Sequence, residues 1–174
     1  RLPDEVAIYN TIDEIVEDDI VDAVILATPP HLLYECALTA ILAGKHVLAE
    51  KPIGIDERES IQLEEAVARS GVCYMSGYSF RYCGALQKVQ ELLRAGAVGG
   101  ITALLGSIGV GSLSSGWIAS PATGGGPLLF VGSHLIDEVL WLVNDKPCEV
   151  SARVRYRSDT KSDETANFAI HFAN

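Results

Sequence analysis

"VDAVILATPPHLLYECALTAILAGKHVLAEKP", residues 21–52, is the stretch that decides the fold class. Residues 22–30 contain a continuous apolar run ended by two prolines, which is typical of a strand buried on both faces of a sheet. Residues 31–44 carry apolar side chains at helical spacing and close with a glycine. The next apolar run, at 46–50, completes the unit. A strand, a helix and a second strand with short links predict parallel strands and a right-handed crossover.

The same alternation continues on both sides of this unit. Thr11 and Asp56 are suitable N-caps for helices at 12–18 and 57–70, and residues 72–78 predict a third strand. In a parallel sheet, ligands bind beyond the carboxyl ends of the strands. The unusual sequences TPP, EKP and YSFR all fall at those ends, so we expect them to lie along one ligand-binding edge.

The second half of the sequence has a different pattern, which begins near residue 81. Helical spacing predicts two helices, at 83–100 and 133–143. Strand-like runs occur three times, at 101–110, 148–157 and 165–173. The last two alternate between apolar and polar residues, as in an antiparallel sheet with one solvent-facing side. We therefore predict two partial domains of a longer protein, an α/β domain at 1–80 and an α+β domain at 81–174.

Composition narrows the possible functions. Of 174 residues, 48% are hydrophobic, which is enough for a substantial core. The 23 acidic and 13 basic residues give a net charge of −10, which argues against a nucleic-acid-binding surface. No stretch reaches the roughly 18 consecutive apolar residues of a membrane span. The cysteines lack CxxC spacing, so we expect reduced, mostly buried thiols and a cytoplasmic protein. They are Cys36, Cys73, Cys83 and Cys148.

Lys51 is the first candidate for chemistry. We expect its ammonium at the mouth of the parallel sheet, with Pro52 fixing the turn that holds it. A lysine so placed can hydrogen-bond a substrate hydroxyl or carbonyl and transfer a proton, particularly if burial lowers its pKa. An exposed lysine paired with Glu50 on a surface loop is the alternative.

His134 is the second candidate, because it follows the Gly-rich segment 124–133 and opens a helix, where it could face a cleft, cap the helix or fill the core. Asp137 could share its helix face or compensate the helix dipole. Trp117 could line a substrate pocket or anchor its loop, and Arg81 could meet a phosphate or carboxylate or form a surface ion pair. The other histidines have no metal-ligand partner at a useful spacing, so we expect no metal site.

Together these segments resemble the glucose–fructose oxidoreductase / inositol dehydrogenase family (Gfo/Idh/MocA). The matching stretches are 21–55, 77–82, 95–101 and 116–142. The resemblance implies the C-terminal part of a Rossmann parallel sheet that binds NAD or NADP, followed by a truncated α+β domain with an open, largely antiparallel sheet. It also implies hydride transfer between nicotinamide and a sugar, polyol or related small carbonyl or alcohol. Homodimers or homotetramers would form through the C-terminal sheet.

The resemblance also implies residue roles. Lys51 would transfer a proton, and His134 would bind or protonate the substrate. The cofactor would be bordered by Thr28, Pro29, Glu50, Lys51, Pro52 and Arg81. The substrate would be bound by Trp117, His134 and Asp137.

Departures from the family pattern are concentrated on the substrate side. Phe130 stands where many members have an aspartate that orients the histidine, and Leu33, Ser79 and Ile118 also differ. The glycine fingerprint for pyrophosphate lies outside this sequence, so we expect this chain alone to bind the cofactor poorly. Phe130 leaves two main alternatives: a less polar substrate, or a non-catalytic nucleotide-binding or regulatory protein of the same fold. A relative that cleaves glycosides through transient oxidation is a third.

Overall fold

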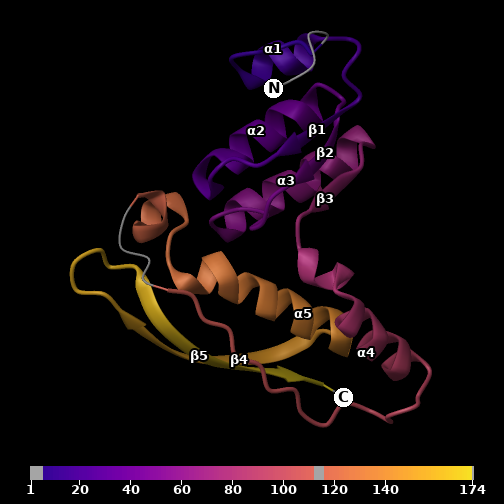
Figure 1. Ribbon diagram of the computed structural model, residues 1–174, viewed down its shortest axis with the longest axis vertical. Helices are drawn as coiled ribbons and strands as arrows, with labels where there is room; N and C mark the ends of the chain where they lie inside the picture. The colour runs from indigo at the N-terminus through magenta and orange to yellow at the C-terminus, as the bar shows by residue number, and fades with distance from the viewer. Residues whose placement is uncertain (1–5, 112–115, 174) are drawn as a thin grey trace. The chain divides into compact units, whose positions relative to one another are not determined.

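The computed structural model describes residues 6–111 and 116–173, which divide into two compact units with the boundary between Gly77 and Tyr78 (Figure 1). The first unit alternates strands and helices, and its strands are parallel. The second unit is built from helices and one antiparallel pair of strands. The chain is therefore an α/β unit followed by an α+β unit, as the sequence predicts.

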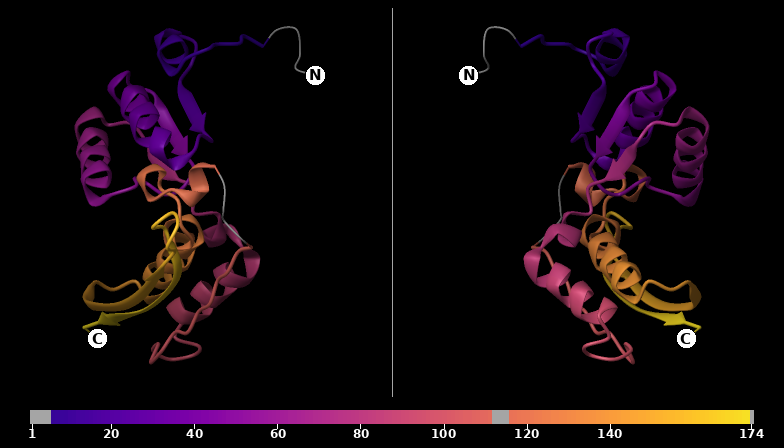
Figure 2. Two further views of the ribbon diagram at one scale, coloured as in Figure 1. Left: turned by 90° about the vertical axis from the view of Figure 1, so that its left-hand side faces the viewer. Right: turned by 90° about the vertical axis from the view of Figure 1, so that its right-hand side faces the viewer.

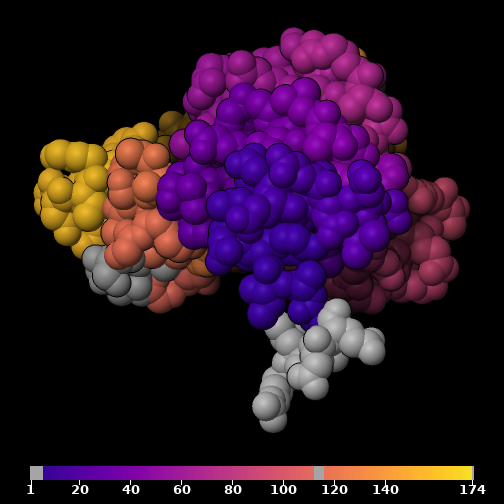
Figure 3. All heavy atoms as spheres, turned by 90° about the horizontal axis from the view of Figure 1, so that it is seen from above, coloured from indigo at the N-terminus to yellow at the C-terminus, as the bar shows by residue number. Residues whose placement is uncertain are grey.

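The first unit contains a three-stranded parallel sheet in the order β1-β2-β3. Its elements are α1 (Ile12–Glu17), β1 (Ala23–Leu26), α2 (Pro30–Leu42), β2 (His46–Ala49), α3 (Glu57–Ser70) and β3 (Tyr74–Ser76). The predicted caps are present: the Thr11 hydroxyl accepts from the Glu14 N–H at 3.2 Å, and the Asp56 carboxylate accepts from the Glu59 N–H at 2.8 Å. Figure 3 shows one face of this unit with its atoms drawn as spheres.

The core of the first unit lies between the sheet and its helices. One side of β1 and β2 contributes Val24, Leu26, Val47 and Ala49. The helices contribute Leu33, Ala37, Ala40, Ile41, Leu63 and Ala66. β1 and β2 therefore bury every second residue, and the expectation that the strand within 22–30 is buried on both faces is wrong. Ile25, Leu48 and Met75 align across the three strands on the opposite face and are exposed, because the described helices all cover the other side.

The second unit begins with a short 3-10 helix, η1 (Ser79–Tyr82), and an amphipathic helix, α4 (Gly84–Arg94). Further along the chain are η2 (Trp117–Ala119), η3 (Pro121–Thr123), η4 (Leu128–Gly132) and α5 (Ser133–Val143). The unit ends in the antiparallel strands β4 (Pro147–Tyr156) and β5 (Asp163–Phe172). Figures 1 and 2 show α5 on one side of these two strands.

The strand expected at 101–110 is absent from the described part of the second unit. A groove of about 1120 Å³ is lined by residues 102–111 on one side and by α5 and β5 on the other. A strand needs a neighbouring backbone at hydrogen-bonding distance, and the groove separates this segment from β5. The apolar composition of residues 101–110 alone therefore did not predict whether they form a strand.

The thiols are also less buried than expected. All four cysteines are unpaired, but only Cys36 is partly buried, and Cys73, Cys83 and Cys148 are exposed. Cys148 lies on β4, where the two-stranded sheet leaves most side chains uncovered. Cys83 lies between η1 and α4, outside any buried layer. Apolar flanking sequence is thus a poor guide to burial in a thinly covered sheet.

Gly126 and Asp163 join the helical run 121–143 to β5. The Asp163 carboxylate accepts a hydrogen bond from the Leu128 N–H at 2.6 Å. Gly126 has a φ of +113°, and a Cβ there would overlap the same carboxylate. The glycine-rich segment therefore serves close packing of the backbone, with Gly125 likewise pressed against the Ile118 carbonyl.

The helical run Pro121–Val143 is, by length and composition, long and apolar enough to cross a bilayer. The core helix of a soluble domain passes the same test. In this unit the run consists of 3-10, π and α turns in succession, and it carries Asp137 in an ion pair.

Candidate functional site

The carboxyl ends of the parallel strands form one edge of the first unit. Leu26 pairs with Ala49, and Ala49 pairs with Ser76, so the three strands end side by side. Backbone hydrogen bonds continue this alignment past the strands, from the Glu50 N–H to Leu26 at 2.8 Å and from the Gly77 N–H to Ala49 at 2.7 Å. The segments that follow β1 and β2 therefore begin at the same edge, and they carry Thr28, Pro29, Glu50, Lys51 and Pro52.

Lys51 lies at this edge in a turn whose next residue, Pro52, is buried. The Lys51–Pro52 peptide bond is cis. Burial lowers the pKa of the Lys51 ammonium from the ordinary value of 10.5, and the nearby Glu50 carboxylate opposes this effect. The side chain is only partly exposed, so its environment differs from that of a freely solvated surface lysine.

Three buried polar atoms at or near this edge have no hydrogen-bond partner among the residues that the structure describes. They are Thr28 Oγ1, His31 Nδ1 and Ser76 Oγ. Buried polar groups are nearly always hydrogen-bonded, so each of these atoms is available to a polar group of a ligand or to an ordered water. Thr28 is among the site residues predicted from the sequence, whereas His31 and Ser76 are not. For Ser76 the only available signal was its position at the end of a predicted strand.

His134 belongs to the second unit, where it is the second residue of α5. Its ring stacks on Phe80, with centroids 4.5 Å apart and an interplanar angle of 17°. Tyr78 meets the same ring edge-on at 6.0 Å. Both aromatic residues lie at η1, and neither was predicted as a site residue, because the contact is made between segments far apart in sequence. The YSF sequence beside Arg81 was the available hint.

Arg81 and Asp137 form a bidentate ion pair that joins η1 to α5. The Arg81 Nε donates to Asp137 Oδ2 at 2.8 Å, and Nη2 donates to Oδ1 at 2.6 Å. The Asp137 side chain is only 11% exposed. The pair raises the pKa of Arg81, while burial and the Asp137 charge raise the pKa of Tyr78. Arg81 thus makes the ion pair that was one of its two alternatives. It lies on a 3-10 turn and not, as expected, at the end of a strand.

Trp117 packs edge-on against Phe130, with ring centroids 5.9 Å apart and an interplanar angle of 76°. Phe130 lies in the π turn η4, immediately before α5. The contact supports the loop-anchoring alternative for Trp117. Phe130 therefore takes part in apolar packing at the position where the family resemblance would put a carboxylate.

The predicted residues fall into two groups, one in each unit. Thr28, Pro29, Glu50, Lys51 and Pro52 share the sheet edge of the first unit. Arg81, His134 and Asp137 gather around η1 and α5 in the second unit, with Trp117 packed separately on Phe130. Within the described ranges 6–111 and 116–173, no group of three or more His, Cys, Asp or Glu side chains could hold a metal ion.

Two family descriptions match successive parts of the chain. Residues 4–78 match an oxidoreductase family with an NAD-binding Rossmann fold. Residues 86–174 match the GFO/IDH/MocA C-terminal domain. The two matches meet close to the boundary between the structural units.

Individual relatives agree with these matches. An uncharacterized oxidoreductase from Synechocystis sp. is 38% identical over 139 residues, which are 77% of this chain and 38% of the relative. A 1,5-anhydro-D-fructose reductase from Ensifer adhaerens is 30% identical over 82% of this chain and 44% of its own length. Among solved structures, an NAD-binding protein from Listeria innocua is 26% identical in sequence and superposes with a TM-score of 0.78. The match covers 97% of this chain and 49% of that protein's chain. The chain thus spans less than half the length of these proteins.

Proposed function

Because the chain belongs to the GFO/IDH/MocA oxidoreductase family, we propose that the protein is an NAD(P)-dependent dehydrogenase or reductase. Its substrate would be a sugar, a polyol or a related small carbonyl or alcohol. The observation that carries this proposal is Lys51, a partly buried lysine with a lowered pKa at the ligand-binding edge of the parallel sheet.

The edge of the first unit suits a dinucleotide. The Thr28 hydroxyl, which has no partner among the described residues, can hydrogen-bond an amide or hydroxyl group, as can Ser76. The segments that follow the strands also carry Pro29, Glu50 and Pro52. When bound, a nicotinamide cofactor supplies or accepts a hydride.

Lys51 carries the proton transfer. In the amine form, its Nζ accepts the hydroxyl proton of an alcohol that is being oxidised. In the ammonium form, it returns a proton to the oxygen of a carbonyl that is being reduced. Burial favours the amine form and therefore makes it available at a pH lower than for a solvated lysine.

His134 binds the substrate or supplies a second proton. The Phe80 ring stacked on the imidazole fixes the plane of the His134 ring and thereby the directions of its ring nitrogens. Asp137, engaged by Arg81, helps to hold η1 against α5 and so acts through position more than by direct contact with substrate.

The test uses the full-length protein with NAD⁺ and NADP⁺ and a panel of sugars, polyols and their aldehydes and ketones. Absorbance of the reduced nicotinamide reports turnover in both directions. Turnover on any member supports the proposal. Cofactor binding measured by calorimetry, with no turnover on the whole panel, contradicts it.

A non-catalytic nucleotide-binding protein of the same fold is the second candidate. The observation that favours it is Phe130, whose contact with Trp117 puts an apolar pair where an orienting carboxylate would assist His134. Tight cofactor binding without turnover would support this candidate. Replacing Phe130 with Asp would then be the direct way to ask whether catalysis can be gained.

We also propose that copies of the protein associate through the C-terminal sheet. We further propose that the protein is cytoplasmic. The exposed side chains of β4, which include Val150 and Tyr156, support association of copies through this sheet. Four unpaired cysteines are consistent with a reducing compartment. Light scattering of the full-length protein measures the oligomeric state, and fractionation of cells measures the location.

A further inference from the structure

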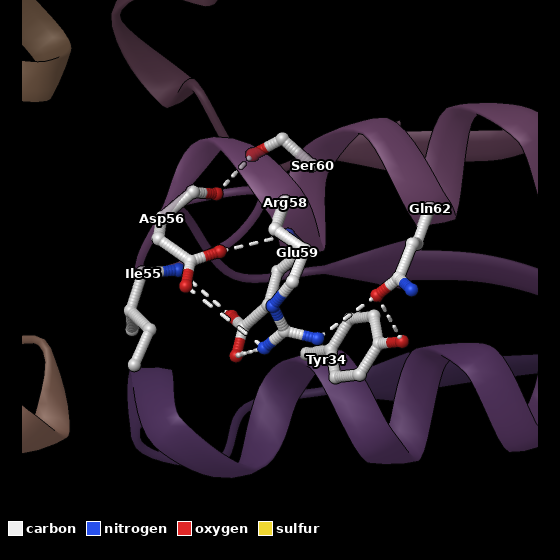
Figure 4. Close-up of polar contacts among 7 residues, drawn as sticks. All are labelled: Tyr34, Ile55, Asp56, Arg58, Glu59, Ser60 and Gln62. Carbon is white, nitrogen blue, oxygen red and sulfur yellow. Dashed lines mark hydrogen bonds and ion pairs between the residues drawn. The ribbon is translucent and has the colours of Figure 1, made fainter.

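The turn that carries Lys51 is fastened at its far end by the first residues of α3. Asp56, the N-cap, accepts from the Glu59 N–H at 2.8 Å, and the Glu59 carboxylate accepts from the Ile55 N–H at 2.9 Å. Figure 4 shows these two bonds, which form a variant of the capping box in which the glutamate accepts from the residue before the N-cap. The Ile55 backbone that Glu59 holds is only four residues after Lys51.

Glu59 is more than an ordinary cap, because it is buried. Only 8% of the residue is exposed, and glutamate is almost never buried without a partner. Its charge is balanced by the N-terminus of α3 and by Arg58, whose Nη2 lies 3.8 Å from Glu59 Oε1. Arg58 is itself held over Tyr34 and hydrogen-bonded to Gln62 at 3.1 Å (Figure 4).

Gly54 brings the turn directly against Glu59. A Cβ at Gly54 would lie 2.8 Å from the Cβ of Glu59 and 3.1 Å from the Ser60 nitrogen, which is closer than side chains pack. Gly54 is buried, and the neighbouring Ile53 packs against the hydrophobic core. The segment between Lys51 and α3 is therefore fixed by one core side chain, one close backbone contact and one hydrogen bond.

The chain contains a matched capping box that lacks this extra contact. At α1, Thr11 accepts from the Glu14 N–H at 3.2 Å, and Glu14 accepts from the Asn10 N–H at 2.7 Å. The hydrogen-bond pattern is the same as at α3, but Glu14 is exposed. Capping alone therefore does not require a buried glutamate, and the burial of Glu59 follows from its contact with the Lys51 turn.

We propose that Glu59 is a positioning residue for Lys51: it holds the turn so that the ammonium stays partly buried at the edge of the sheet. The role rests on the proton transfer assigned to Lys51 in the proposed function. Loss of the Glu59 carboxylate releases the Ile55 backbone and lets the turn move toward solvent. Lys51 then loses both its alignment and the burial that favours its amine form.

The test compares Glu59→Ala with Glu14→Ala in the full-length protein, because each variant removes the carboxylate of an equivalent capping box. Misplacement of a reacting group by about 1 Å can cost a hundredfold, so we expect Glu59→Ala to lower kcat about tenfold to a hundredfold. Glu14→Ala should leave kcat unchanged. Glu59→Gln keeps an oxygen acceptor for the Ile55 N–H and should restore most of the activity.

A second readout does not depend on turnover. Reductive methylation with isotope-labelled formaldehyde gives each lysine an NMR signal that follows its protonation, and Lys51→Arg identifies the signal of Lys51. We expect Glu59→Ala to raise the pKa of Lys51 toward that of a solvated lysine, and Glu14→Ala to leave it in place. A helix cap with a purely structural role would not produce this difference.

The outcomes separate the two proposals. Full turnover in Lys51→Met would overturn the proposed function. The NMR comparison of Glu59→Ala with Glu14→Ala would still test whether Glu59 holds the Lys51 turn. Loss of turnover in Lys51→Met, with Glu59→Ala equal to Glu14→Ala in both readouts, overturns the positioning role alone. If Glu59→Ala does not fold, Gly54→Ala forces the turn away from Glu59 and must change kcat and the Lys51 pKa in the same directions. Unchanged values in a folded Gly54→Ala protein overturn the role as well.

Discussion

Lys51 in the first unit and His134 in the second are held by different means. The turn of Lys51 is fixed mainly by its backbone, through the sheet at one end and Glu59 at the other. His134 lies within a regular helix, and its ring is oriented by side chains of η1, above all Phe80. A group held through backbone bonds depends on the atoms that accept those bonds, such as the Glu59 carboxylate, whereas a group held by ring packing depends on the neighbouring rings. The predictions below test this contrast.

The largest expected effect is the loss of Lys51 itself. Lys51→Met in the full-length protein should lower kcat about a hundredfold or more, since general acid–base catalysis contributes on this scale. Lys45→Met is the control, because Lys45 precedes β2 at the opposite end of the strand and bonds the Asp18 carbonyl. Steady-state kinetics and thermal unfolding are measured together. Equal kcat values for the two variants would contradict the role of Lys51.

The pH dependence of alcohol oxidation should follow Lys51. Because burial lowers the pKa of the Lys51 ammonium below 10.5, the rate should rise with pH through a midpoint below that value as the amine forms. Lys51→Arg remains protonated throughout and should remove this rise. A pH–rate profile that keeps the same midpoint in Lys51→Arg would assign the titration to another group.

Breaking the Arg81–Asp137 pair tests how firmly η1 is held to α5. Asp137→Ala removes a largely buried carboxylate together with both of its bonds to Arg81, and we expect a loss of about 1–3 kcal/mol in the free energy of unfolding. The control is Glu91→Ala, which removes the exposed pair with Lys88 and should cost less than about 1 kcal/mol. Urea unfolding measures both, and equal losses would show that the Asp137 pair is no stronger than a surface pair.

Phe80 should affect substrate affinity more than turnover. Phe80→Ala removes the ring stacked on His134, and a stacked pair contributes about 0.5–1.5 kcal/mol, so KM should rise about threefold to tenfold. Phe80→Tyr keeps the ring and should keep KM. An unchanged KM in Phe80→Ala would mean that His134 is oriented by other contacts.

Thr28 should affect cofactor affinity alone. Thr28→Val removes a hydroxyl that has no partner among the described residues, so the stability of the protein should stay the same. Cofactor Kd should rise about threefold to tenfold, the scale of one hydrogen bond, and Thr28→Ser should restore it. Calorimetric titration with NAD⁺ and NADP⁺ measures this effect. A loss of stability without a change in Kd would place the hydroxyl in the fold and not at the ligand.

Local signals in the sequence predicted the first unit well. Thr11, Asp56 and Gly71 mark helix ends through contacts within a few residues, and the structure has caps at all three. The strand predicted at 101–110 is absent, because a strand depends on a neighbouring strand that composition does not reveal. The prediction that β1 is buried on both faces is wrong for a related reason. Ile25 is exposed because the described helices cover only the other face of the sheet.

The sequence indicated Thr28, Lys51 and His134 as candidate site residues, but it did not indicate His31, Ser76 or the residues that hold the candidates in place. Lys51 and His134 follow from the resemblance and from their positions at element ends. Phe80 reaches His134 only through folding, and nothing in its immediate sequence indicates a stacked ring. Glu59 looks like one of several acidic residues in the first turn of a helix, and its burial is visible only in three dimensions.

The contact between Gly126 and Asp163 has a consequence for how these sequences can diverge. Any side chain at position 126 would collide with the carboxylate that accepts from the Leu128 N–H. A change at either position alone is therefore blocked or leaves that N–H without its acceptor. Across related proteins, the two positions should vary together: a residue other than glycine at 126 should occur where the aspartate at 163 has also been replaced.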